Sequence, residues 1–237
     1  MDNLRGISSS NWLRLLRENR FAIDRAYRNR AWALTMISLR NSRIKRREDA
    51  RYAAEAARAV IQPPIFILGH WRSGTTLMHE LLALDEQFAY PNQLQVANPH
   101  TFLTLEHEVE AELAAMEERT RPMDNMLVNY KSPGEDEAAL SVMSLCSPVI
   151  AWAFPRQEAR YDRYHTFTEV PEADLARWSA AFVSFLKKLT LRYQKPLVLK
   201  SPPHTARVRL LLRLFPDARF IHIYRDPSTV VRSTQQI

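Results

Sequence analysis

Two glycines and a pair of threonines follow a short apolar segment, and their spacing is typical of a loop that binds phosphate. Gly69 and Gly74 stand five residues apart, and Thr75 and Thr76 come directly after the second glycine. Glycine lets backbone N–H groups turn inward around an anion, and the N-terminus of a following helix adds a favourable dipole. A nucleotide triphosphatase would carry lysine at position 75. The cation stands upstream instead, at Arg72, whose planar guanidinium suits an oxyanion face.

A second candidate anion site lies towards the C-terminal end of the sequence. The apolar residues 220–224 predict a strand that delivers Arg225 to its carboxyl end. Asp226 and Pro227 then open a helix, because proline is tolerated in the first helical turn. Ser233 follows eight residues after Arg225, so both side chains reach one anion only if the chain folds back. Taken alone, this pattern also fits an ordinary strand end at the surface.

Together, the two segments resemble the nucleotide-binding motifs of sulfotransferases. Residues 66–77 resemble the 5′-phosphosulfate loop of the bacterial and tyrosylprotein enzymes, and residues 220–233 resemble their 3′-phosphate motif. The resemblance covers about residues 62–237 and includes the Ser-Pro-Gly-Glu-Asp-Glu segment at 132–137. It implies a P-loop-like three-layer α/β/α fold with a parallel sheet. It also implies an enzyme that moves a sulfuryl group from 3′-phosphoadenosine 5′-phosphosulfate (PAPS) to a hydroxyl or amine.

The resemblance further implies roles for single residues, with adenosine 3′,5′-diphosphate as the product and no metal. Arg72 would stabilise the sulfonate and the leaving group. The 5′-phosphate would be held by Ser73, Gly74, Thr75 and Thr76, and the 3′-phosphate by Arg225 and Ser233. Arg72 and Lys200 would also contact the nucleotide. Contact with a 3′-phosphate would separate PAPS from ATP.

The general base has two rival candidates. His204 follows Lys200 and faintly resembles the histidine of the Lys-Thr-His segment in cytosolic sulfotransferases, although four residues separate the two here rather than two. Glu135 and Glu137 flank Asp136 in an acidic triplet, and carboxylate bases also occur in the family. Because a lone histidine is more often structural and an acidic triplet more often solvated, both candidates stay open.

The length of the chain leaves other functions open. Family members continue past the 3′-phosphate motif with helices and a basic loop that closes over the nucleotide, whereas this sequence ends at Ile237. We therefore expect a fragment of a longer product or a shortened protein with impaired catalysis. The alternatives are a PAPS-binding or membrane-associated module without turnover, and a nucleotide kinase, which Thr75 disfavours. The acceptor, whether a small molecule, a lipid or a glycan, is not readable from the sequence.

Strands and helices alternate along the part of the chain that would position these residues. We expect strands at 65–68, 88–90, 197–200 and 219–224, and helices at 77–84, 103–119, 171–193 and 205–214. Short continuous apolar runs are typical of strands buried on both faces of a parallel sheet. The alternation therefore predicts an α/β fold with a parallel sheet.

The N-terminal quarter reads as a basic helical arm, residues 1–61, ahead of the domain at 62–237. Apolar residues at 12, 16, 23, 27 and 34 recur at helical spacing, and Pro63-Pro64 ends the helical pattern. Residues 1–60 contain 14 basic and 6 acidic residues, against 19 and 20 in the remainder. This excess suits a solvated face, a nucleic-acid partner or a membrane surface. Since a lipid alcohol would suit a cationic arm, we expect peripheral membrane contact rather than nucleic acid.

The composition also indicates the compartment. Cys146 is the single cysteine, which excludes a disulfide framework and a zinc site built from cysteines. No apolar run approaches the roughly 20 residues of a membrane-spanning helix, and the Arg-rich start lacks the apolar core of a signal peptide. We therefore expect a cytoplasmic protein.

Overall fold

A computed structural model describes residues 2–108, 119–120 and 126–235 of the chain. Its central sheet has three parallel strands in the order β4-β1-β5, formed by Val198–Lys200, Ile65–Leu68 and Arg219–His222. In the register, Ile67 lies between Lys200 and Ile221. The carboxyl ends of all three strands therefore meet at one edge of the sheet. The strand expected at 88–90 is reduced to one isolated bridge, between Ala89 and Leu197.

Helices cover both faces of this sheet. On one face, Ile65 and Ile67 pack against Met78 of α3 (Thr75–Ala83). On the other face, the ring of Phe66 lies 6.2 Å from that of Phe182 in α9 (Glu172–Tyr193). The helix α10 (Val208–Leu214) joins the same cluster through Leu211. The alternation of side chains along β1 thus separates two helical layers, and the predicted three-layer α/β/α fold is confirmed.

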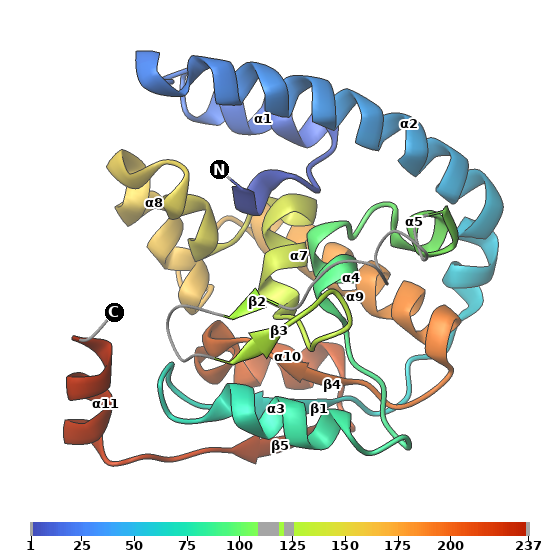
Figure 1. Cartoon of the computed structure of the whole chain (residues 1–237), viewed down its shortest axis with the longest axis vertical. Helices are drawn as coiled ribbons and strands as arrows, with labels where there is room; N and C mark the ends of the chain where they lie inside the picture. The colour runs from blue at the N-terminus through green and yellow to red at the C-terminus, as the bar shows by residue number, and fades with distance from the viewer. Residues whose placement is uncertain (1, 109–118, 121–125, 236–237) are drawn as a thin grey trace.

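The remaining elements frame these layers (Figure 1). The other helices in the described part of the chain are α1 (Ser9–Glu18), α2 (Arg28–Arg58), α4 (Gln93–Ala97), α5 (Phe102–Glu108), α7 (Asp136–Ser144), α8 (Glu158–Asp162) and α11 (Pro227–Thr234). The strand β2 (Arg119–Thr120) pairs antiparallel with β3 (Leu127–Val128). The short 3-10 helices are η1 (Asp2–Leu4), η2 (Arg25–Tyr27), η3 (Pro148–Trp152), η4 (Pro155–Gln157), η5 (Arg163–His165) and η6 (Pro202–Ala206).

Two of the expected helices differ from the observed ones. The helix expected at 103–119 is described as α5 up to Glu108; residues 109–118 lie outside the described part, and Arg119 belongs to β2. The helix expected at 205–214 is divided into η6 and α10 at Arg207, which has non-helical backbone angles.

The N-terminal helices form a further layer that shares the protein core. The side chain of Trp12 donates to Thr35 and that of Ser9 meets Ser42, so α1 and α2 run antiparallel. The apolar positions 12–34 therefore do not form one helical face, because the chain reverses between α1 and α2. Trp12 and the core of the sheet domain belong to one hydrophobic cluster, and Asn11 donates to the Val142 carbonyl in α7 at 2.8 Å. The predicted arm is thus packed into the fold rather than extended from it.

None of the described helices combines the length and hydrophobicity that crossing a membrane requires.

Candidate active site

The loop between β1 and α3 depends on its two glycines. At Gly69, where φ is +155°, a Cβ atom would lie 2.8 Å from Ser73 Oγ and 2.9 Å from the Ile223 carbonyl. Gly74 has a φ of +103° at the N-cap of α3, and a Cβ there would meet none of the described residues within 4 Å. Gly69 therefore permits close packing, while Gly74 provides the turn and leaves its outer side open. The first N–H groups of α3 lack intrahelical acceptors and are available to an anion.

Hydroxyl groups fix the shape of this loop. The Ser73 hydroxyl donates to the His70 carbonyl at 2.6 Å, so it closes the loop on itself. The Gly69 N–H donates to Thr205 Oγ1 at 2.9 Å, which ties the loop to η6. Ser73, expected to contact phosphate, is therefore used within the loop and is absent from the cavity wall described below.

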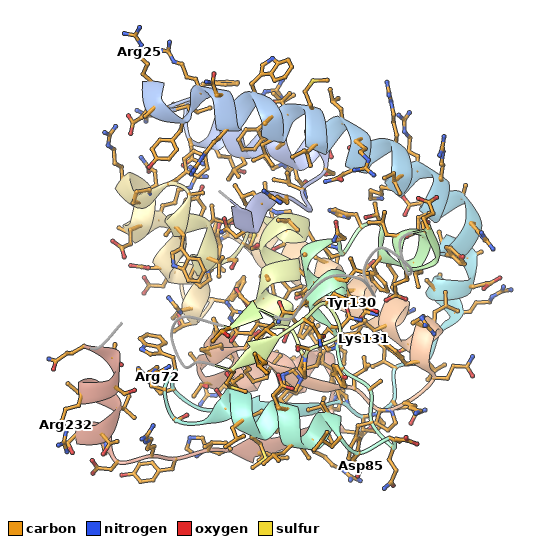
Figure 2. The ribbon with its side chains drawn as sticks, in the orientation of Figure 1. Arg25, Arg72, Asp85, Tyr130, Lys131 and Arg232 are labelled. Atoms are coloured by element: carbon orange, nitrogen blue, oxygen red, sulfur yellow. The ribbon has the colours of Figure 1, made fainter. Side chains whose placement is uncertain are left out.

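Arg72 joins the loop to the C-terminal helix. Its Nε donates to Ser233 Oγ at 2.9 Å, and Arg225 donates to the Arg72 carbonyl at 3.0 Å. Asp226 caps α11 by accepting from the Thr229 N–H at 3.0 Å, and the helix returns Ser233 to the loop. The structure therefore brings these three predicted residues together. Figure 2 shows Arg72 between the loop and α11.

Arg72 also has a strained backbone, with a φ of +68°. A non-glycine residue in the left-handed region costs roughly 1–3 kcal/mol and is often found at functional sites. The hydrogen bonds from Arg225 and to Ser233 hold this conformation in place.

Lys200 and Glu135 form an ion pair beside the loop. The pairing of β4 with β1 puts Lys200 at the carboxyl edge of the sheet. Its ammonium donates to Glu135 Oε1 at 2.5 Å and to Thr76 Oγ1 at 3.3 Å. The Lys200 side chain is 3% exposed, whereas that of Glu135 is 44% exposed. A buried cation thus holds a carboxylate whose other side is open.

A cavity of about 250 Å³ brings most of the predicted site together. Its wall is formed by Trp71, Arg72, Gly74, Thr75, Thr76, Leu77, Met126, Glu135, Pro202 and Arg225. Cations, hydroxyls, one carboxylate and an apolar side therefore surround one space. A larger cavity of about 410 Å³ lies near Lys195, ahead of β4, between Tyr90, Tyr130 and Tyr193. Figure 2 marks Tyr130, and none of the predicted site residues lines that cavity.

His204 lies away from the cavity. It is fully buried, its Nε2 is 2.6 Å from Asp136 Oδ2, and its ring stacks on Phe182 with centroids 5.6 Å apart. Burial alone would raise the pKa of Asp136, but the charge and hydrogen bond of His204 and the Ser201 hydroxyl hold that pKa below its ordinary value. The position of His204 gives no support to the expected base role, because no acceptor reaches a ring enclosed in the core.

Glu137 is also withdrawn from the cavity. Its carboxylate receives two hydrogen bonds from the guanidinium of Arg207, at 2.5 and 3.0 Å, and one from the Ser147 hydroxyl at 2.7 Å. Arg207 in turn lies over the ring of Trp178, 5.2 Å from its centroid. Both carboxylate oxygens of Glu137 therefore accept hydrogen bonds from groups inside the protein. Glu137 thus anchors α7 and is not placed to act on a substrate.

The acidic triplet thus has one outward and two inward members. Successive residues at a helix start point about 100° apart, so three neighbouring carboxylates cannot share one surface. Asp136 and Glu137 bind the segment 200–207 and leave Glu135 at the cavity. The sequence made Glu135 and Glu137 equal candidates and did not predict the contacts of Thr205 or Arg207. The turn-forming residues 132–134 were the sequence signal that a helix begins shortly after them, at Asp136.

Two further histidines are buried and neutral. Burial and the nearby charge of Lys200 lower the pKa of His79, in α3, to about 4. Burial and the charge of Lys188 lower the pKa of His100 to about 3.

The chain is similar to known proteins along most of its length. Residues 63–237 match the model of a family described as the sulfotransferase family. Over 230 residues the chain is 37% identical to two proteins, from Mycobacterium bovis and Mycobacterium tuberculosis, each named omega-hydroxy-beta-dihydromenaquinone-9 sulfotransferase Stf3. These alignments cover 97% of this chain but 59% of each relative. The fold is similar to the crystal structure of sulfotransferase STF9 from Mycobacterium avium, with a TM-score of 0.53 at 21% identity, covering 87% of this chain and 54% of that one.

Proposed function

The chain belongs to the sulfotransferase family, and from this premise we propose that it moves a sulfuryl group from PAPS to a hydroxyl, with Glu135 as the general base. The observation that carries the proposal is the shared cavity of Arg72, Thr76 and Glu135, with Lys200 bonded to the last two. The cations and the N-terminus of α3 suit an anionic donor. The open carboxylate suits proton removal from an acceptor.

The nucleotide would be held by its two charged ends. Thr75 and Thr76 open α3 and line the cavity, so we assign the 5′-phosphosulfate to this turn. Arg225 and Ser233 reach the same loop from the other side, and we assign the 3′-phosphate to them. Ligand sites usually measure about 300–1,000 Å³. A cavity of about 250 Å³ therefore suits the phosphosulfate end rather than the whole nucleotide.

The proposed transfer is a single displacement at sulfur. Glu135 accepts the proton of the acceptor hydroxyl, whose oxygen forms a bond to sulfur. The bond between sulfur and the bridging oxygen of the 5′-phosphate breaks, and that oxygen keeps the electron pair. Arg72 and Lys200 stabilise the charge that develops there. Since protonation of Glu135 weakens its attraction for the ammonium of Lys200, the same cation becomes available to the leaving oxygen.

The acceptor we propose is a hydroxylated lipid. The named substrate of the two mycobacterial relatives, an omega-hydroxy-beta-dihydromenaquinone-9, motivates this choice. We also propose that the protein is cytoplasmic, as the sequence suggested. The thiol of Cys146 is free and buried, and burial raises its pKa to about 11.

Two experiments test this function against its rivals. Calorimetric titration is expected to show tighter binding of adenosine 3′,5′-diphosphate than of ADP or Mg-ATP, and tighter binding of Mg-ATP would favour a nucleotide kinase. Incubation with PAPS labelled in its sulfuryl group and a hydroxylated menaquinone is expected to label the lipid. Binding of the diphosphate without any labelled product would reduce the proposal to a PAPS-binding module.

A further inference from the structure

The outer face of α2 carries a line of large apolar side chains that the fold does not bury. Trp32, Met36 and Leu39 are 69%, 49% and 46% exposed. They are separated by four and three residues, so they lie on one side of the helix. The opposite side of the same turns is packed into the core, where Ala31 and Leu34 are 6% and 4% exposed. The helix therefore has a second apolar face that points outward.

This outer face is continued by arginines in both directions. Arg28 precedes Trp32 by four residues, and Arg43 and Arg46 follow Leu39 at intervals of four and three. All three arginines are exposed. Between Arg25 and Arg47 the sequence has eight basic residues and no acidic one. Figure 1 shows α2 along the outside of the molecule, and Figure 2 shows Arg25 pointing away from it near the start of this helix.

The polar contacts that attach α2 to the rest of the fold include a set on its inner side, away from this outer face. On its inner side, Asn41 donates to the carbonyls of Arg5 and Ile7, at 2.7 and 3.0 Å. Glu48 pairs with Lys188 and accepts from the Thr104 N–H at 2.8 Å. Single exposed apolar residues are ordinary on protein surfaces, whereas contiguous ones mark contact sites. Three exposed apolar side chains in line, with arginines at both ends, are therefore not explained by packing within the fold and indicate a contact site.

We propose that this face docks on an anionic membrane surface. Trp32, Met36 and Leu39 enter the headgroup region, while Arg28 and Arg43 contact the phosphates on either side. A helix with apolar and cationic residues of this kind lies in the plane of the interface. Tryptophan is favoured there because one part of its ring system is apolar and another donates a hydrogen bond. A nucleic acid would bind the arginines but would gain no affinity from three aligned apolar side chains.

This inference stands apart from sulfuryl transfer, and its test requires no turnover. The whole chain is sedimented with vesicles of phosphatidylcholine alone or with about one third phosphatidylglycerol. Binding is expected with the anionic vesicles and is expected to fall as salt rises. Trp32→Ala is expected to weaken binding about tenfold. The double variant Arg43→Ser, Arg46→Ser is expected to weaken it about 25-fold, since each cation near such a surface contributes about fivefold.

Matched controls lie on other parts of the molecule. Leu84 follows α3 and is 78% exposed, so Leu84→Ser removes a large exposed apolar side chain from another side of the molecule. Arg209 and Arg213 are exposed on α10, and their serine double variant removes the same charge. Both controls are expected to bind vesicles like the unchanged chain.

Three outcomes would overturn the proposal. The first is no binding of the unchanged chain to anionic vesicles. The second is an equal loss of binding in the control variants. The third is full binding by Trp32→Ala together with loss in the arginine variant, which would mean a general polyanion surface without insertion. Thermal unfolding of every variant is measured as well. Equal unfolding temperatures show that differences in vesicle binding do not come from misfolding.

Discussion

The Nε of Arg72 donates to the hydroxyl of Ser233 at 2.9 Å, across 161 residues of sequence. This bond joins the loop after the first strand of the sheet to the helix after the last one. Arg225 contributes a second link, to the carbonyl of Arg72. The residues to which we assign the two phosphates of the nucleotide therefore touch each other.

Replacing Arg72 by alanine is expected to lower kcat at least 100-fold. The guanidinium is proposed to meet the charge on the leaving oxygen, and loss of one such donor costs about 3 kcal/mol of barrier. Arg232→Ala, on the exposed side of α11, is the matched control and is expected to keep its activity. Steady-state rates and thermal unfolding decide the matter, and an active Arg72→Ala enzyme would remove the residue from the mechanism.

Removing Arg225 is expected to affect adenosine 3′,5′-diphosphate and AMP differently. These ligands differ by the 3′-phosphate, and a charged hydrogen bond to it contributes about 1.5–3 kcal/mol. Arg225→Ala is therefore expected to weaken binding of the diphosphate by that amount, as measured by calorimetry, and to change the binding of AMP very little. Ser233→Ala, which removes a neutral hydroxyl, is expected to cost about 1 kcal/mol. Equal losses for both ligands would mean that Arg225 only supports the Arg72 backbone.

Two residues of the acidic triplet are expected to differ in what their replacement changes. Replacing Glu135 is expected to lower mainly the rate, and replacing Glu137 mainly the stability. Glu135→Gln is expected to reduce kcat about 10²–10⁴-fold, the range for a general base. It is expected to destabilise the fold less than Glu137→Gln, because Glu135 is 44% exposed and the glutamine amide oxygen can still accept from Lys200. Glu137→Gln is expected to destabilise the fold by about 3–5 kcal/mol, because it leaves the buried Arg207 without its carboxylate. Rates and denaturant unfolding of the two variants test this pair. A stable Glu137→Gln protein, or a fully active Glu135→Gln enzyme, would contradict the assignment.

Buried His79 is expected to make the protein less stable in mild acid. Its pKa is about 4 in the folded protein and about 6.5 when unfolded. Between these values the unfolded chain binds a proton that the folded chain does not, so the free energy of unfolding falls as pH falls. The slope is up to about 1.4 kcal/mol per pH unit. Denaturant titrations from pH 7 to 4 are expected to show a shallower slope for His79→Gln.

The control for that measurement is the exposed His222 on β5. His222→Gln is expected to keep the slope of the unchanged protein. If His79→Gln also keeps it, His79 is not buried in its neutral form.

Local patterns predicted the strand β1 and the turn that follows it at residues 69–74. Four consecutive apolar residues predicted β1 at its observed bounds, and the two glycines marked the turn. These signals are local because a buried strand and a left-handed turn each restrict the residue types at their own positions.

The misses required information from distant parts of the chain. His204 was a candidate base because it follows a strand end, but its burial depends on Phe66 and Phe182, which lie far away in sequence. Charge asymmetry made residues 1–61 look separable, whereas packing of Trp12 in the common core was not visible from one helical pattern. Periodicity also does not show where a chain turns back, so the hairpin of α1 and α2 looked like one face.

The segment from Lys200 to Arg207 has a wider consequence. Thr205 binds the loop between β1 and α3, while His204 and Arg207 bind α7, whose N-cap residue is Glu135. The residues to which we assign the donor site and the base are thus positioned by one segment, through side chains that do not line the cavity. Trp71 and Leu77, in the apolar wall of the cavity, take no part in these contacts, so mutations there are expected to leave the segment in place. We therefore expect that the proposed acceptor preference can diverge during evolution without a change in the residues assigned to sulfuryl transfer.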